Sequence, residues 1–143
     1  MKGYQVNIAP LACQLSNLIA FTTNPAAEYP ETIFEQNQSF SVQVAVEFIG
    51  SGAIALMPLG MAVQFDFFAE PYGTGSKVKL GNAQVRTSSQ VYTYTPTLTI
   101  AQPVSVGLVK EEIYQITAVL RVGEPNWPAF ITGFIDGLSI QTY

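Results

Sequence analysis

Histidine is absent from this chain, and cysteine occurs only once, at Cys13. Histidine and the cysteine thiolate are the groups that most often transfer protons, bind metals or attack substrates near neutral pH. Cys13 has no basic residue within ten positions to stabilise its thiolate, so we expect a buried thiol that behaves as a small apolar side chain. Any enzyme built from this sequence would have to work with carboxylates alone. We therefore expect a protein that is not an enzyme.

Charge is also scarce. Asp, Glu, Lys and Arg make up 11% of the residues, against about 25% in an average soluble domain. The net charge is −4, and no cluster of Lys and Arg occurs. Nucleic acids and anionic membranes are bound through such clusters, so we expect neither as a partner. A surface with so few charges instead favours contact with other protein surfaces.

Long apolar runs and paired cysteines are missing as well. The longest apolar stretch, residues 53–63, is interrupted by Pro58 and Gly60, and is too short for a membrane-spanning helix. We therefore expect a chain that is not inserted in a membrane. The lack of a recognisable signal peptide and of paired cysteines suggests a reducing compartment, and hence a cytoplasmic location. The alternative is a mature secreted chain whose signal peptide has been removed, which would look the same.

The sequence is rich in apolar residues that alternate with polar ones. Hydrophobic residues make up 48% of the chain and aromatic residues 12%. Alternation is clearest in residues 39–49, where Phe40, Val42 and Val44 are separated by Ser41 and Gln43, the pattern of a half-buried strand. No useful helical periodicity occurs. Further strands are expected at residues 15–22, 61–70, 77–86, 90–100, 113–122 and 129–143.

Seven to nine short strands joined by turn-rich connections predict an all-β, two-sheet antiparallel sandwich. We expect a single domain over residues 1–143, with residues 1–14 as an irregular N-terminal segment. The architecture is immunoglobulin-like in outline only. The disulfide of antibody domains is impossible with one cysteine, and Trp127 lies in a Pro-flanked turn rather than in a strand. A small β-barrel is the alternative fold.

The carboxylates do not form a recognisable catalytic or metal-binding pattern. Asp66 and Glu70 share one face of a strand, but four residues of extended chain separate their Cα atoms by roughly 13 Å. We interpret both as solvated surface residues. Glu28, Glu31 and Glu35 lie in a Pro-interrupted segment without the spacing of a calcium-binding loop. No metal or other cofactor is therefore expected.

Aromatic and apolar residues outside the regular core pattern are the candidate interaction residues. Tyr and Trp are common anchors of interfaces because they bury a large area with few rotatable bonds. Two uncharged segments could also mediate self-association. Residues 53–59 either lie buried across the end of the sandwich or form an exposed apolar flap. Residues 130–135 could form an unprotected edge strand. The candidates are Phe68, Tyr72, Trp127, Phe130, Phe134 and Tyr143, with Leu56 and Met57 from the first segment.

Two functions remain open at this point. The first is a non-enzymatic module that acts through protein contacts, as a subunit of a homo-oligomer or larger assembly. The second is a ligand-binding module for carbohydrate, in which Tyr72 and Trp127 would stack on a sugar beside the polar Asn126 and Thr74.

Overall fold

The structure is a computed structural model, and it describes residues 11–22, 31–124 and 131–143. Within them, nine strands form two sheets. Sheet A contains β1 (Ala12–Thr22), β3 (Phe40–Ile49), β6 (Thr93–Tyr94) and β7 (Thr97–Ile100). Sheet B contains β2 (Ile33–Phe34), β4 (Ala62–Pro71), β5 (Val78–Arg86), β8 (Ile113–Gly123) and β9 (Ile131–Thr142).

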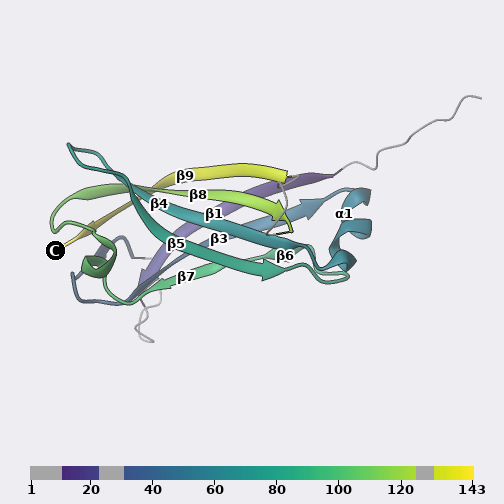
Figure 1. The fold of residues 1–143 in the computed structure, drawn as a ribbon, viewed down its shortest axis with the longest axis horizontal. Helices are drawn as coiled ribbons and strands as arrows, with labels where there is room; N and C mark the ends of the chain where they lie inside the picture. Colours follow the sequence, from purple (N-terminus) through teal and green to yellow (C-terminus); the bar gives the residue numbers. More distant parts are fainter. Residues whose placement is uncertain (1–10, 23–30, 125–130) are drawn as a thin grey trace, which may run out of the picture.

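The strands of sheet B lie in the order β2–β9–β8–β4–β5, and β3 is the central strand of sheet A. In sheet A, β3 pairs with β1 on one side and with β6 and β7 on the other. All pairs are antiparallel except β2 with β9, which is parallel. Figure 1 shows β9, β8, β4 and β5 side by side, with β1 and β3 crossing them at an angle. The predicted all-β, two-sheet sandwich is confirmed.

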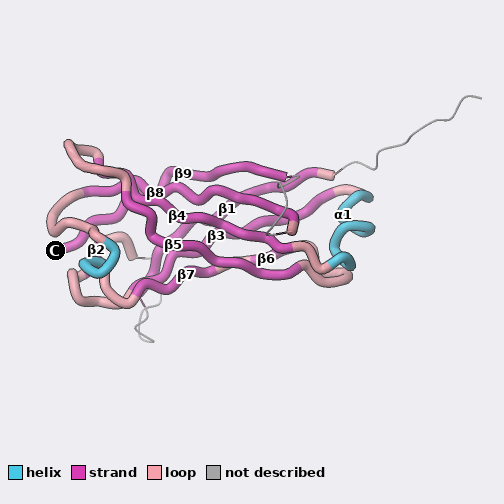
Figure 2. Tube along the Cα trace, viewed as in Figure 1, coloured by secondary structure: helices cyan, strands magenta, loops and turns pink. Residues whose placement is uncertain are grey.

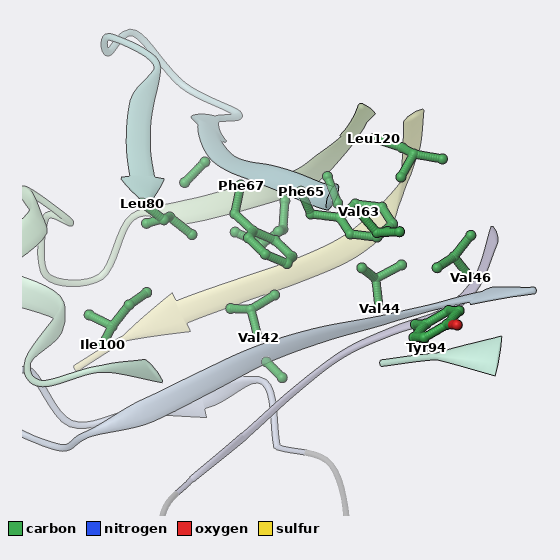
Figure 3. Close-up of a cluster of buried hydrophobic side chains, with 14 of the residues drawn as sticks. Val42, Val44, Val46, Val63, Phe65, Phe67, Leu80, Tyr94, Ile100 and Leu120 are labelled. Atoms are coloured by element: carbon green, nitrogen blue, oxygen red, sulfur yellow. The ribbon is translucent and has the colours of Figure 1, made fainter. Parts of the chain in front are cut away.

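The core fills the space between the two sheets. Val42, Val44 and Val46 alternate along β3 and are fully buried, as the sequence pattern predicts. They face buried residues of β4 that alternate in the same way, including Phe65 and Phe67 (Figure 3). Each fully buried Val or Phe side chain stabilises the fold by about 1.5–3 kcal/mol through removal of apolar surface from water.

Two of the expected strands differ at their boundaries. Residues 90–100 form two short strands, β6 and β7, because Pro96 between them has no N–H group to donate to the ladder. The carbonyl of Pro96 still accepts a hydrogen bond from the N–H group of Val44. The first strand begins at Ala12, so residues 12–14 of the segment expected to be irregular belong to β1.

Short helices close the two ends of the sandwich, and the sequence pattern did not predict them. Residues 51–59 form α1 (Ser51–Leu56) and the 3₁₀ helix η1 (Met57–Leu59) at one end. A second 3₁₀ helix, η2 (Pro103–Val106), lies at the opposite end with the C terminus and the β4–β5 turn (Figures 1 and 2). None of the helices in the described residues is long and apolar enough to cross a membrane.

Candidate functional site

Sheet B turns one face toward the core and the other outward. Phe65 and Phe67 of β4 are fully buried, so the alternating side chains of Asp66 and Phe68 belong to the outer face. Residues that lie directly opposite one another on paired strands share a face. The strand register therefore identifies the remaining residues of this outer face.

Three exposed apolar side chains lie in one row across the outer face, which we call the terminal row. Tyr72 follows β4, and its N–H group donates to the carbonyl of Ile113 at 3.0 Å. Ile113 pairs with Gln141, which in turn pairs with Ile33. Tyr72, Ile113 and Ile33 are 63%, 45% and 57% exposed. The hydroxyl group of Tyr72 lies 2.9 Å from that of Ser139 on β9, so its ring crosses β8.

A second row, the central row, carries opposite charges at its two ends. Phe68 pairs with Lys79 of β5 and with Thr117 of β8. Thr117 lies at the register shift between β8 and β9, where Asp136 and Gly137 are the two residues of β9 that have no Cα partner. The ammonium group of Lys77 lies 4.6 Å from the centre of the Phe68 ring, a cation–π contact that leaves this aromatic half-buried.

Two further aromatic residues are exposed along β9. Phe134 pairs with Val119 on the outer face and is 68% exposed. Tyr143 follows the end of β9, and its N–H group extends the ladder to the carbonyl of Phe34. Because Thr142 is fully buried, the exposed Tyr143 side chain continues the outer face beyond Gln141.

Asp66 is the charged centre of this outer face, and the expectation that it is solvated is wrong. Only 8% of the residue is exposed. Its two carboxylate oxygens lie 3.3 Å from Arg121 and 3.9 Å from Lys79, and the amide of Gln64 donates to it at 3.1 Å. The positive charges of Arg121 and Lys79 offset the cost of removing the Asp66 carboxylate from water. Glu70, on the same face, is exposed as expected.

The fold brings together half of the predicted interaction residues. Phe68, Tyr72, Phe134 and Tyr143 come from distant parts of the sequence, and all lie on the outer face of sheet B.

The two candidates from residues 53–59 lie at the far end of the sandwich. Met57 is fully buried in the core, so the prediction of a surface role for its side chain is wrong: η1 turns it inward beneath the end of the sheets. Leu56 is half-buried and packs against the same core. The remaining two candidates, Trp127 and Phe130, lie outside the described residues, as does Asn126.

A cavity of about 330 Å³ lies beside the β4–β5 turn, between this turn and the start of β8. Thr74, Ser76 and Glu112 contribute polar groups to its lining, and Val78 and Tyr114 contribute apolar wall. One carboxylate oxygen of Glu112 accepts a hydrogen bond from the N–H group of Gly73 at 3.2 Å. Tyr72 does not line the cavity, because its ring lies over sheet B.

Cys13 is the one cysteine of the chain, and it lies in β1 opposite Phe48. Partial burial raises the pKa of the Cys13 thiol, so the thiolate is disfavoured near neutral pH. In residues 11–22, 31–124 and 131–143, no three His, Cys, Asp or Glu side chains are grouped so that they could hold a metal ion.

Comparison with known proteins gives a likeness at the level of structure alone. No protein family matches the sequence. No curated protein matches it either. Among solved structures, the chain is similar to AggA, the major subunit of aggregative adherence fimbriae type I from Escherichia coli. The match has 8% sequence identity and a TM-score of 0.45, and it covers 99% of this chain and 100% of that one.

This comparison corrects the expected cytoplasmic location. The similar protein is named as the major subunit of aggregative adherence fimbriae, which is not a cytoplasmic description. The cytoplasmic expectation depended on the cysteine content and on the lack of a recognisable signal peptide. A mature secreted chain has the same two properties, so neither separates the two locations.

The sequence interpretation missed Ile33 and Ile113. Ile113 had a usable signal, because Tyr114 and Ile116 alternate on the inward face and so assign Ile113 to the opposite face. No sequence signal identifies Ile33, since β2 is only two residues long and pairs with Gln141 and Thr142. That pairing is a long-range contact that no local pattern encodes.

Proposed function

We propose that this protein is a non-enzymatic β-sandwich module that acts through protein contacts, as a subunit of a homo-oligomer or larger assembly. The observation that supports this most directly is the outer face of sheet B. It gathers large apolar side chains, most of them exposed, from four segments of the chain around the charge cluster at Asp66. Its apolar members are Ile33, Phe68, Tyr72, Ile113, Val119, Phe134 and Tyr143.

The edge of β9 that extends past β2, unpaired by any strand in the described residues, adds a second source of contact. The N–H groups of Gln141 and Tyr143 point away from β8 and donate to the carbonyls of Thr32 and Phe34. Along a strand, the direction of the N–H group alternates together with the face on which the side chain lies. Phe134 lies on the outer face like Gln141 and Tyr143, so its N–H group also points away from β8. None of the described strands pairs with β9 at that position. Such an edge can accept a strand from another chain.

The mass of the protein in solution tests this function. We expect light scattering behind size-exclusion chromatography to show reversible association of the wild-type chain as concentration rises. The double variant Tyr72→Ser/Phe134→Ser should shift the protein toward the monomer, because it removes two exposed aromatic side chains from the outer face.

Ile54→Ser is the matched control. Ile54 is 65% exposed, as much as the two aromatics, but it lies on α1 at the far end of the sandwich. Association should survive this change. A wild-type chain that stays monomeric at the highest attainable concentration would exclude self-assembly, and equal loss in all variants would exclude the outer face.

Carbohydrate binding is the second candidate, and the cavity beside the β4–β5 turn is the observation in its favour. Hydroxyl groups of Thr74 and Ser76 and the carboxylate of Glu112 border it, next to apolar wall. Trp127 is the single tryptophan, so its fluorescence can be followed across a panel of glycans. A saturable change that Glu112→Gln removes would support this function, and the absence of saturable binding of every glycan by isothermal titration calorimetry would reject it.

A further inference from the structure

The two margins of the outer face carry opposite charges at the same level of the sheet. Lys79 on β5 and Asp136 on β9 both belong to the central row and are both exposed. On the side of β5, Lys77 adds a second positive charge near the central row. On the side of β9, Glu35 adds a negative charge just beyond β2.

This arrangement is self-complementary under one kind of symmetry. A two-fold axis parallel to the strands, placed between β8 and β4, exchanges the two margins and keeps each row at its own level. Lys79 of one copy then faces Asp136 of the second copy, and the contact occurs twice. A two-fold axis perpendicular to the strands, lying in the plane of the sheet, would place β5 over β5 and bring like charges together.

The apolar residues agree with the first arrangement. The same axis places β8 of one copy over β4 of the other. In the central row, Phe68 then faces Thr117, and in the terminal row, Tyr72 faces Ile113. Sheets that pack face to face lie about 10 Å apart with their strands nearly aligned, which leaves space for these side chains to interdigitate.

We propose that the outer face of sheet B binds a second copy of this chain through a two-fold contact in which Lys79 of each copy pairs with Asp136 of the other. This inference depends on the proposed function and specifies its geometry. Four strands about 4.8 Å apart, each about ten residues long, cover about 600 Å² per partner. That is below the roughly 800 Å² per partner of a standard interface, so the dimer is weak and reversible.

Charge reversal tests the pairing. Asp136→Lys alone and Lys79→Asp alone should each weaken self-association about tenfold or more, because each places like charges together twice. An equimolar mixture of the two variants should regain association. In the mixed dimer, both contacts again join opposite charges. Sedimentation equilibrium of each variant and of the mixture measures the three dissociation constants.

The control is Glu47→Lys, which reverses an exposed charge on the outer face of sheet A. It should leave association of the chain unchanged. If the wild type associates but the mixture does not recover, the two-fold pairing is wrong while the proposed function stands. If the wild type is strictly monomeric, both are wrong.

Lys79→Asp also places a second carboxylate near Asp66, so a second measurement that uses no charge reversal is needed. In a Cys13→Ser background, Lys79→Cys and Asp136→Cys are made in separate chains. A short bis-maleimide should link the two variants when they are mixed and link neither variant to itself. Equal linking in all three samples would overturn the proposed arrangement.

Discussion

Asp66 shows how a single carboxylate is accommodated in a sheet with few charges. It is buried, while the two cations beside it, Arg121 and Lys79, keep more than half of their side chains in solvent. We expect Asp66→Asn to lower the free energy of unfolding by about 1–2 kcal/mol, less than for a fully buried pair because solvent screens both cations. Urea denaturation followed by circular dichroism measures the change.

The exposed pair of Arg86 and Glu124 provides the matched control. Its atoms approach to 3.2 Å, closer than either ion-pair contact of Asp66, but both side chains are about half exposed. Glu124→Gln should therefore change the stability by less than about 0.5 kcal/mol. Equal effects at the two sites would show that burial of Asp66 does not strengthen its contacts.

Cys13 gives a prediction about pH. Burial raises the pKa of its thiol, so the folded state favours the neutral form more than the unfolded state does. The resulting stabilisation is complete below the thiol pKa of the unfolded chain and is lost as the pH rises through the higher pKa of the folded chain. At pH 8, we expect Ellman's reagent to react more slowly with the native protein than with the urea-unfolded protein. Equal rates would contradict this prediction.

Among the elements, β9 depends on a bulge that lets it follow β8. The register shifts between the pairs Ile116–Leu138 and Ala118–Ile135, and Gly137 adopts a φ of +101° there. A side chain at that φ is strained, so Gly137→Ala should destabilise the protein by about 1–2 kcal/mol.

Gly133→Ala is the comparison in the same strand. Gly133 has no positive φ, and a Cβ atom there would lie 3.8 Å from the Leu15 side chain, an ordinary contact. We expect its thermal midpoint to stay close to that of the wild type, whereas that of Gly137→Ala falls. A similar fall in both variants would show that loss of glycine alone, not the bulge, is responsible.

The longer elements were predictable from sequence because alternation is a local property. The segment of β3 needed only its own apolar period of two, and β4, β5 and β8 followed in the same way. The six residues of α1 make fewer than two turns, too few for a helical period to show. β2 has no pattern of its own, since it exists through pairing with the end of β9.

The outer face illustrates the same limit at the level of the candidate site. Phe68 could be selected from sequence because it interrupts the polar face of a strand, and Tyr72 because it is an aromatic residue in a Pro-flanked turn. Their proximity to Phe134 and Tyr143 depends on the order β9–β8–β4, which long-range pairing determines. Residue types were therefore predictable, but not the surface that they form together.

At the scale of the whole molecule, sheet B presents two different routes to association, and they differ in how far the assembly grows. A two-fold contact between outer faces uses the same surface on both copies and closes at the dimer. Strand addition along the edge of β9 that no described strand occupies pairs the backbone groups of different chains, and continues when a further edge is left open. The charge pattern of the central row favours the closed form.

We therefore expect the mass to reach a plateau at twice the 15.5 kDa of one chain as protein concentration rises. Added salt should lower the fraction of protein that is dimeric at a given concentration. It screens the exposed contact between Lys79 and Asp136 while leaving the apolar contacts in place. For Asp136→Lys, added salt should instead raise the fraction of dimer, since salt then screens a repulsion. Sedimentation velocity at two salt concentrations measures both effects. A mass that keeps rising with concentration would instead indicate growth through strand edges, and would exclude the closed dimer as the main assembly.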